Sequence, residues 1–199
     1  MNGRARTAAF GRWKWRSSPQ SRLVSTLAYD TYLPTKTTVK PLQPPLLILH
    51  GLLGSKQNWR TLAKELSARL ETKVLAVDLP NHGQSPHTKT MSFDQINADL
   101  DQLLRTEQLS GGSFDLLGHS MGGKVAMHWA LSKPVEAKLD RLIVVDIAPL
   151  PKTLSPTFAK YLAFMREANA RAQPYTSKKE ADADLGLIEP VIAVSLLSP

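Results

Sequence analysis

Apolar runs and amphipathic stretches alternate along the middle of the chain, and this alternation predicts an α/β fold. Four short apolar runs lie at residues 44–51, 73–83, 113–118 and 140–149. Runs of this length are typical of strands buried on both faces of a mainly parallel sheet. Three stretches with apolar residues at helical spacing lie at residues 58–70, 92–109 and 121–131. Strand and helix in this order predict right-handed crossovers and a doubly wound, mostly parallel sheet.

Both ends of this pattern differ from its middle. An early strand is predicted within residues 25–34, and Ser92 with Gln95 predicts a capping box at the start of the second helical stretch. After Pro151 the strands stop, and three helical stretches follow at residues 155–172, 177–188 and 189–197. We therefore divide the chain into a leader at residues 1–28, an α/β core at residues 29–151 and a helical cap or lid segment at residues 152–199.

The net charge of +8 is concentrated in the leader. Residues 1–28 contain six Arg and Lys side chains and no Asp or Glu, which leaves 19 basic against 17 acidic side chains elsewhere. A nearly balanced body offers no large cationic surface for a nucleic acid. An acid-free leader with several Arg and Ser residues is typical of a mitochondrial transit peptide, so we expect a mitochondrial protein. A disordered basic tail of the same composition is the alternative.

Composition also narrows the chemistry. The chain contains no Cys, which excludes disulfides, zinc thiolates and thiol nucleophiles. No apolar run approaches the ~20 residues that a membrane-spanning helix needs. H-E-x-x-H is absent, and no cluster of His and carboxylates suggests a metal. We therefore expect no cofactor, no metal and no transmembrane segment, with small molecules as partners; no feature predicts the oligomeric state.

The segment GHSMGGK, which starts at Gly118, fits two motifs with different chemistry. As G-x-x-x-x-G-K it approaches a phosphate-binding P-loop, but Val125 stands where that motif needs a hydroxyl after the lysine. As G-x-S-x-G it puts Ser120 on a sharp strand-to-helix turn, where a nucleophilic serine needs small neighbours such as Gly118 and Gly122. The nucleophile elbow explains more of these residues than the P-loop does.

A serine nucleophile also needs N–H donors for the negative charge that develops on the carbonyl oxygen. The N–H of Met121 starts the following helix, whose dipole favours an anion at that end. A second donor is expected in the loop after an earlier strand. The loop that ends the apolar run at residues 44–51 supplies it with the N–H of Leu52. In doubly wound sheets such groups meet beyond the carboxyl ends of the strands.

Four segments in this order, HGLLGSKQNW, DLPNHGQSPH, GHSMGGKVAM and VVDIAP, resemble the α/β-hydrolase superfamily. Within it they are similar to a mitochondrial branch that includes fungal ethanol acetyltransferases and related serine esterases. The resemblance implies an acyl-enzyme on Ser120, with Asp146 as the acid of the catalytic triad. It also implies hydrolysis of an ester or thioester, or transfer of an acetyl group to ethanol from acetyl-CoA, which would then be a substrate.

The base of that triad has no counterpart in this sequence. In the family the histidine follows the acid, whereas all five histidines here precede Asp146, namely His50, His82, His87, His119 and His128. Pleat alternation directs His119 away from Ser120 and predicts a core position for it. The resemblance therefore implies that the C-terminal part of the fold is missing, which leaves residues 140–149 as an exposed apolar edge. A catalytically inactive remnant is the alternative function, and a P-loop nucleotide binder is a distant third.

Overall fold

The computed structural model describes residues 27–34, 43–107, 109, 112–132, 138–150, 156–171, 173 and 175–188. The expected leader, apart from its last two residues, lies outside the described residues, as does the helix predicted over residues 189–197. The described residues take in most of the predicted α/β core and two of the three helices predicted after Pro151.

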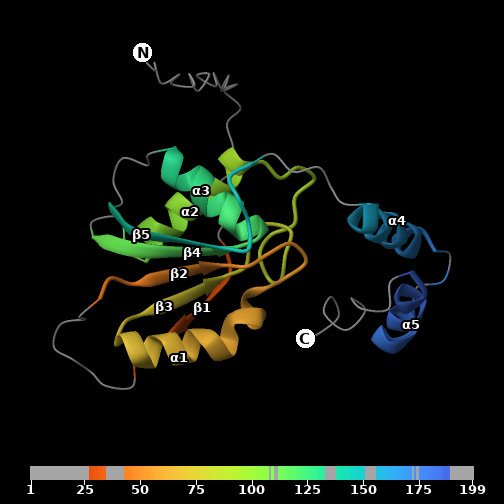
Figure 1. Ribbon diagram of the computed structural model, residues 1–199, viewed down its shortest axis with the longest axis horizontal. Coiled ribbons are helices and arrows are strands. Elements are labelled where there is room, and N and C mark those ends of the chain that lie inside the picture. Colours follow the sequence, from red (N-terminus) through yellow and green to blue (C-terminus); the bar gives the residue numbers. More distant parts are fainter. Residues whose placement is uncertain are drawn as a thin grey trace, which may run out of the picture.

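Five strands form one mixed sheet in the order β1-β3-β2-β4-β5 (Figure 1). Their bounds are Tyr29–Tyr32 for β1, Leu46–Leu49 for β2, Val74–Val77 for β3, Ser113–His119 for β4 and Lys138–Val145 for β5. β1 pairs with β3 in antiparallel orientation, while the other three pairings are parallel. The predicted α/β fold with a mostly parallel sheet is thus confirmed.

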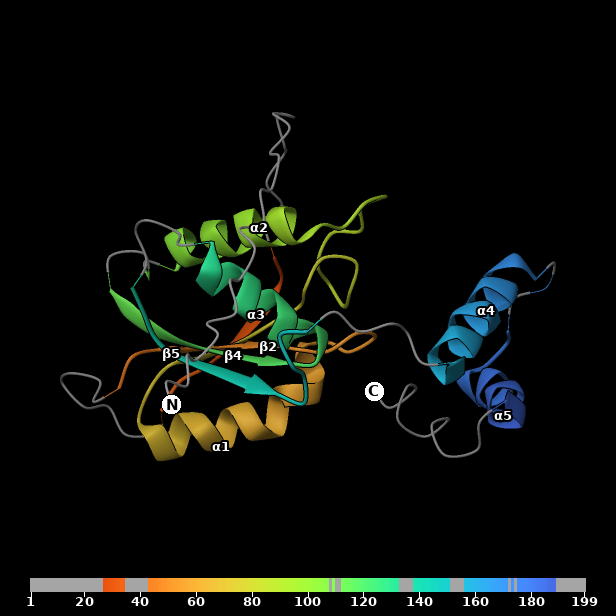
Figure 2. The same ribbon diagram turned by 45° about the horizontal axis from the view of Figure 1, so that its top comes forward.

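Helices cover both faces of this sheet (Figure 2). α1 (Arg60–Leu70) lies on one face, and α2 (Phe93–Thr106) and α3 (Met121–Leu131) lie on the other. α4 (Pro156–Ala170) and α5 (Lys178–Ile188) lie beside the sheet, on the side toward which its parallel strands point. None of the helices in the described part of the chain is long and apolar enough to cross a membrane.

The core consists of two apolar layers on either side of the sheet. Every residue of β2 and β3 is buried, as expected for central strands with apolar side chains on both faces. The layer facing α2 and α3 is the larger, and it includes Phe114 and Trp129. The layer facing α1 is smaller and includes Leu46, Ile48 and Leu117. Full burial contributes roughly 1.5–3 kcal/mol for a large apolar side chain, so these layers hold helices and sheet together.

β5 is an edge strand of different character. Its apolar residues Leu142, Ile143 and Val145 are 39%, 39% and 38% exposed. β5 pairs with β4 on one side, and no strand among the described residues pairs with its other side. α1 contacts β3 and β1 at the opposite part of the sheet and so does not cover β5. The exposed apolar edge predicted for residues 140–149 is therefore present in the described part of the chain.

Capping residues start the helices on either side of the sheet. Ser92 precedes α2, and its Oγ accepts the N–H of Gln95 at 3.2 Å, which satisfies one of the free N–H groups of the first turn. Among the described residues the Gln95 side chain does not bind the Ser92 N–H in return, so half of the predicted capping box forms. A complete box links Ser55 and Asn58 at η1 (Lys56–Trp59), a 3₁₀ helix that leads into α1.

The last two residues of the expected leader belong to the packed part of the fold. Leu27 is 2% exposed and joins the larger apolar layer. Ala28 donates its N–H to Ser85 Oγ at 2.9 Å and accepts the N–H of Asp78 at 2.8 Å. The packed body therefore includes Leu27, two residues before the predicted start of the core.

Candidate active site

Ser120 forms a one-residue turn between a strand and a helix. β4 ends at His119 and α3 begins at Met121, so no wide phosphate-binding loop separates them. The backbone of Ser120 has φ 50° and ψ −114°, a strained conformation that costs about 1–3 kcal/mol. Its N–H donates to Val145 O at 2.9 Å, and its carbonyl oxygen accepts the N–H of Lys124 at 3.1 Å. β5 and α3 thus hold the strained serine in place.

Gly118 and Gly122 allow this turn to close. A Cβ atom on Gly118 would lie 2.3 Å from the carbonyl oxygen of Gly122. A Cβ atom on Gly122 would lie 2.5 Å from the carbonyl oxygens of Leu49 and His50. All of these neighbours are backbone atoms in a close-packed region, which have little room to move aside. The G-x-S-x-G spacing is therefore a steric requirement of the turn.

The loop after β2 brings a backbone donor beside the elbow. Gly54 N–H donates to Gly51 O at 3.1 Å, which closes a four-residue turn over residues 51–54, here called the oxyanion turn. A Cβ atom on Gly51 would lie 3.4 Å from Ser120 Cβ, so this turn passes directly against the serine. Within the described residues the N–H of Leu52 donates to no acceptor.

The N–H of Met121 is the other expected donor. As the first N–H of α3 it has no acceptor within the helix, and it lies at the positive end of the helix dipole. β2 and β4 are parallel neighbours, so the turn after β2 and the helix after β4 begin at the same edge of the sheet. The structure therefore brings the Leu52 and Met121 N–H groups to the same edge as Ser120.

A buried ion pair supports the oxyanion turn. Lys56 Nζ lies 3.0 Å from Asp78 Oδ2, and the two side chains are 3% and 1% exposed. The backbone N–H groups of Lys56 and Gln84 also donate to this carboxylate, at 2.6 and 2.9 Å. Burial alone raises the pKa of Asp78, but these N–H donors and the Lys56 ammonium together lower it below its usual value. The pair thus ties the loop after β2 to the loop after β3.

His50, the residue after β2, uses both ring nitrogens in structural hydrogen bonds. Leu79 N–H donates to its Nε2 at 3.0 Å. A backbone N–H can only donate, so Nε2 is the acceptor and the proton resides on Nδ1, which donates to Gly51 O at 2.7 Å. Burial lowers the pKa of His50 to about 4. The ring is therefore neutral at pH 7 and its lone pair is engaged.

His82, in the loop after β3, is bound in the same way. Leu53 N–H donates to its Nε2 at 3.2 Å, and its Nδ1–H donates to Pro80 O at 2.9 Å. The centroids of the His82 and His50 rings lie 5.0 Å apart. Neither imidazole keeps a free nitrogen that would accept the Ser120 proton.

His119 does not occupy the core position predicted for it. Its side chain is 40% exposed, and its ring lies edge-on to Trp59 with centroids 6.3 Å apart. This side chain borders a cleft, which it lines together with Trp59 and with Leu62 of α1. The prediction of a core histidine is wrong because strand alternation gives the direction of a side chain and not what covers it.

Of the other two histidines, one lies on α3 and the other in the loop after β3. His128 stacks on Phe93 with ring centroids 5.1 Å apart, and its Nδ1 lies 2.9 Å from Asn97 Nδ2. His87 is exposed in the loop after β3. In the described ranges no group of three or more His, Asp or Glu side chains is arranged to hold a metal ion.

Asp146 follows Val145, the residue whose carbonyl oxygen holds the elbow. Its backbone has φ 56°, in the left-handed region, and its side chain is 84% exposed. Asp146 Oδ2 lies 3.9 Å from His119 Nε2. The structure therefore brings this carboxylate to the sheet edge that carries Ser120, while leaving it in solvent.

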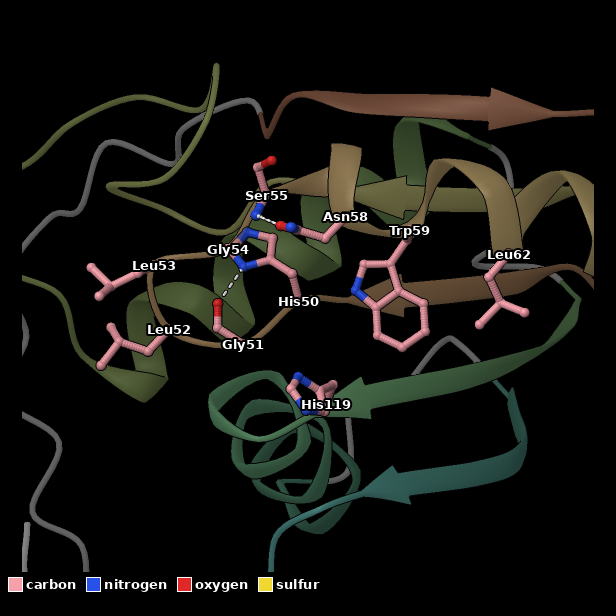
Figure 3. Close-up of a pocket in the computed structure, with 10 residues that line it drawn as sticks. All are labelled: His50, Gly51, Leu52, Leu53, Gly54, Ser55, Asn58, Trp59, Leu62 and His119. Carbon is pink, nitrogen blue, oxygen red and sulfur yellow. Dashed lines mark hydrogen bonds between the residues drawn. The ribbon is translucent and has the colours of Figure 1, made fainter. Parts of the chain in front are cut away.

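A cleft of about 500 Å³ opens beside the oxyanion turn (Figure 3). Its lining consists of His50, Gly51, Leu52, Leu53, Gly54, Ser55, Asn58, Trp59, Leu62 and His119. Figure 3 shows Trp59 and His119 facing each other, with Leu52 and Leu53 on the turn at one end. Ser120 is not part of this lining, so the cleft borders the candidate oxyanion donor and not the candidate nucleophile.

Sequence reasoning assigned no role to the residues that support the turn, above all Lys56, Asp78 and His82. Only the position of these residues, directly after predicted strands, could have pointed to a role for them. In two neighbouring predicted strands the apolar residues are followed directly by polar ones. HG follows residues 44–49, and DLPNHG follows residues 73–77. Carboxyl ends of neighbouring parallel strands meet at one edge, so polar residues there can contact one another.

The matches to known proteins agree with the α/β fold described above. The family profile described as "alpha/beta hydrolase fold" matches residues 44–189. The sn-1-specific diacylglycerol lipase ABHD11 of Danio rerio is 47% identical over 123 residues, which are 62% of this chain and 38% of that protein. A probable alcohol acetyltransferase of Saccharomyces cerevisiae is 34% identical over 145 residues, which are 72% of this chain and 42% of that protein.

Among solved structures, a marine microorganism esterase matches with a TM-score of 0.69 and 31% identity. The match covers 87% of this chain and 62% of the esterase. The chain spans about half the length of the curated relatives it matches.

Proposed function

The chain belongs to the α/β-hydrolase family, and on this premise we propose that Ser120 carries out acyl transfer through an acyl-enzyme. Ser120 Oγ attacks the carbonyl carbon of an ester or thioester, and its proton passes to a base. The N–H groups of Leu52 and Met121 stabilise the oxyanion that forms. The leaving alcohol or thiol takes up the proton, and water or an alcohol then releases the acyl group.

One observation carries this proposal above the others. A strained serine lies between a helix N-terminus and a turn whose Leu52 N–H has no acceptor among the described residues. Strain of this kind persists only where the surrounding structure enforces it, and it clusters at active sites. Donors that are already oriented stabilise developing charge without reorganisation, which is the largest single contribution in many acyl-transfer enzymes.

We propose Asp146 as the acid that orients the base. The base itself is not His50 or His82, because both of their lone pairs already accept backbone N–H groups. His119 Nε2 lies 3.9 Å from Asp146 Oδ2, but among the described residues no hydrogen bond joins its ring to Ser120. None of these three histidines is placed to act as the base, which keeps a non-catalytic role as the second candidate.

For the substrate we propose an ester or thioester with an apolar acyl or alkyl group. The relatives are named a diacylglycerol lipase and alcohol acetyltransferases, which share acyl chemistry and differ in acyl length. Leu52, Leu53 and Trp59 give the cleft beside the oxyanion turn an apolar character, which supports an apolar group there. Acetyl-CoA and ethanol are candidate donor and acceptor, with acetyl-CoA as a substrate and no cofactor required. Exclusion of water decides between transfer and hydrolysis, a task we assign to the α4–α5 segment.

The test is Ser120→Ala in the protein expressed from its complete reading frame. We measure hydrolysis of a small activated acetyl ester and transfer of its acetyl group to ethanol. Ser113→Ala, at the other end of β4, is the control. We expect Ser120→Ala to lose at least ~10³-fold in kcat/KM with an unchanged unfolding midpoint. Activity within about tenfold of wild type, a barrier change of only ~1.4 kcal/mol, would refute the proposal.

We also propose import into mitochondria, supported by the basic, acid-free composition of the leader. Because Leu27 is buried in the core, we expect processing to occur before this residue. N-terminal sequencing of protein recovered from mitochondria should find a mature end between about Trp15 and Leu27. Protein that retains Met1 and fractionates with the cytosol would contradict this proposal.

A further inference from the structure

The proposed mechanism gives no role to His82, a buried imidazole that contacts the oxyanion turn. The residue is 8% exposed and lies in the loop after β3, a separate segment from the oxyanion turn. Its Nε2 accepts the N–H of Leu53 at 3.2 Å, and its Nδ1–H donates to Pro80 O at 2.9 Å. His82 therefore connects the two loops through one acceptor and one donor.

The peptide that His82 holds is the one that most needs support. Leu53 has φ 62°, a conformation that residues with a side chain rarely adopt. It is the third residue of a turn closed by the bond from Gly54 N–H to Gly51 O, the position where a positive φ favours glycine. Because a positive φ is unfavourable for leucine, rotation of the Leu52–Leu53 peptide to give a turn with negative φ at Leu53 would relieve this strain. The bond from Leu53 N–H to His82 opposes that rotation.

The peptide on the other side of Leu52 is held as well. Gly51 O accepts His50 Nδ1–H at 2.7 Å and Gly54 N–H at 3.1 Å. In a planar trans peptide the carbonyl and the following N–H point in opposite directions, so bonds to Gly51 O also aim the N–H of Leu52. Leu52 thus lies between two peptide groups, each bound by a buried imidazole.

From this arrangement we infer that His82 is a positioning residue, which fixes the Leu52–Leu53 peptide and so preserves the turn conformation in which the Leu52 N–H, carried by the neighbouring Gly51–Leu52 peptide, is aimed at the reacting carbonyl oxygen. The inference rests on the proposed function, in which Leu52 is an oxyanion donor. His82 contacts neither substrate nor Ser120 in this role. Its contribution is to hold a strained turn in the one conformation that leaves the donor free.

This role predicts a specific kinetic signature. A mispositioned oxyanion donor weakens binding of the transition state and leaves binding of the ground-state ester nearly unchanged. Removal of an oxyanion donor costs about 10²–10³-fold in kcat, and a donor that is only loosened should cost less. We therefore expect His82→Ala to lower kcat by about 10- to 100-fold while KM changes less than about threefold.

The experiment compares three variants of the protein expressed from its complete reading frame. His82→Ala removes the acceptor, and His82→Gln keeps an amide oxygen for Leu53 N–H and an amide N–H for Pro80 O. His87→Ala is the matched control, because it removes an exposed imidazole from the same loop. Hydrolysis of an activated acetyl ester gives kcat and KM, and NMR hydrogen exchange gives the protection of the Leu53 N–H.

The expected result is a loss of kcat and of Leu53 protection in His82→Ala, recovery of both in His82→Gln, and wild-type behaviour in His87→Ala. A normal kcat in His82→Ala, or unchanged Leu53 protection, would overturn the inference. So would an equal loss of kcat in His82→Gln that retains Leu53 protection. If wild type shows no Ser120-dependent turnover, the proposed function fails, and the inference is then judged by exchange alone. Loss of Leu53 protection in His82→Ala and its return in His82→Gln would support the positioning role.

Discussion

Two strands that end at the candidate site, β2 and β5, are built in opposite ways. All four residues of β2 are buried, and the turn after it is bound by His50 and His82. β5 exposes apolar side chains and has no partner on its outer edge among the described residues, and Asp146 at its end is 84% exposed. Ser120, the proposed nucleophile, lies between them, with its N–H bound to the end of β5.

This difference between the two strands matches the different requirements of the two proposed catalytic groups, an oxyanion donor after β2 and a triad acid after β5. Oxyanion donors act by being aimed in advance, so they need a rigid, dry support, and the β2 side supplies it. A triad acid acts through its charge on a base, and charge acts weakly across solvent. Within the described residues the β5 side leaves Asp146 84% exposed, with His119 Nε2 3.9 Å from its carboxylate. The β2 half of the site is therefore held in position by buried residues, whereas the β5 half is exposed in the described part of the chain.

The largest expected effect concerns the β5 side. Asp146→Asn, in the protein expressed from its complete reading frame, should lower kcat by roughly 10³–10⁴-fold, because the base loses the charge that orients it and stabilises its protonated form. Steady-state kinetics on an activated acetyl ester measure this loss. Asp140→Asn on the same strand is the control, and it should act like wild type. A near-silent Asp146→Asn would make this residue an ordinary strand end and remove it from the site.

A smaller effect is expected from the elbow, the joint between the two sides. Gly118→Ala forces a Cβ atom to within 2.3 Å of a backbone oxygen, so we expect a loss of about 3–4 kcal/mol in the free energy of unfolding. Gly112→Ala at the other end of β4 is the matched control, since nothing lies within 4 Å of its Cβ position. Denaturant unfolding of both variants measures the difference. Equal stability of the two would mean that the turn opens without strain.

The third prediction tests the buried side through pH. The pKa of His50 is about 4 in the folded protein and about 6.5 when unfolded, so the unfolded chain binds the proton first. The contribution of neutral His50 to the free energy of unfolding is fully present above pH 6.5 and declines as the pH falls toward 4. Below pH 4 the free energy of unfolding is lower by about 3 kcal/mol. Denaturant unfolding between pH 7 and 4 measures the slope. His50→Gln cannot titrate and should lack it; parallel slopes in both proteins would place the pH dependence elsewhere.

Much of the fold follows from local sequence patterns, and the part that does not is long-range. The apolar runs at residues 44–51 and 73–83 predict β2 and β3, because only central strands bury side chains on both faces. The predicted helix over residues 121–131 has the observed bounds of α3. The antiparallel direction of β1 was not predicted, since the sequence of a strand does not specify its partner.

For the site, the sequence identifies Ser120 and its glycines, because the elbow is encoded within a few adjacent residues. It gives no indication of the bond between His82 and Leu53, which are 29 positions apart in the chain. The misjudged position of His119 has the same origin. Its surroundings depend on where α1 packs, which no residue near His119 specifies.

The bond from Ser120 N–H to Val145 O has a consequence for biosynthesis. The donor leaves the ribosome first, and at roughly 5–20 residues per second the acceptor follows about one to five seconds later. Until then β4 is itself an open edge, and the strained serine lacks the partner that holds it. An unpaired apolar edge invites pairing with other chains or capture by chaperones. Slow codons in this part of the message would prolong that interval, so translation speed bears on how many molecules assemble the elbow correctly.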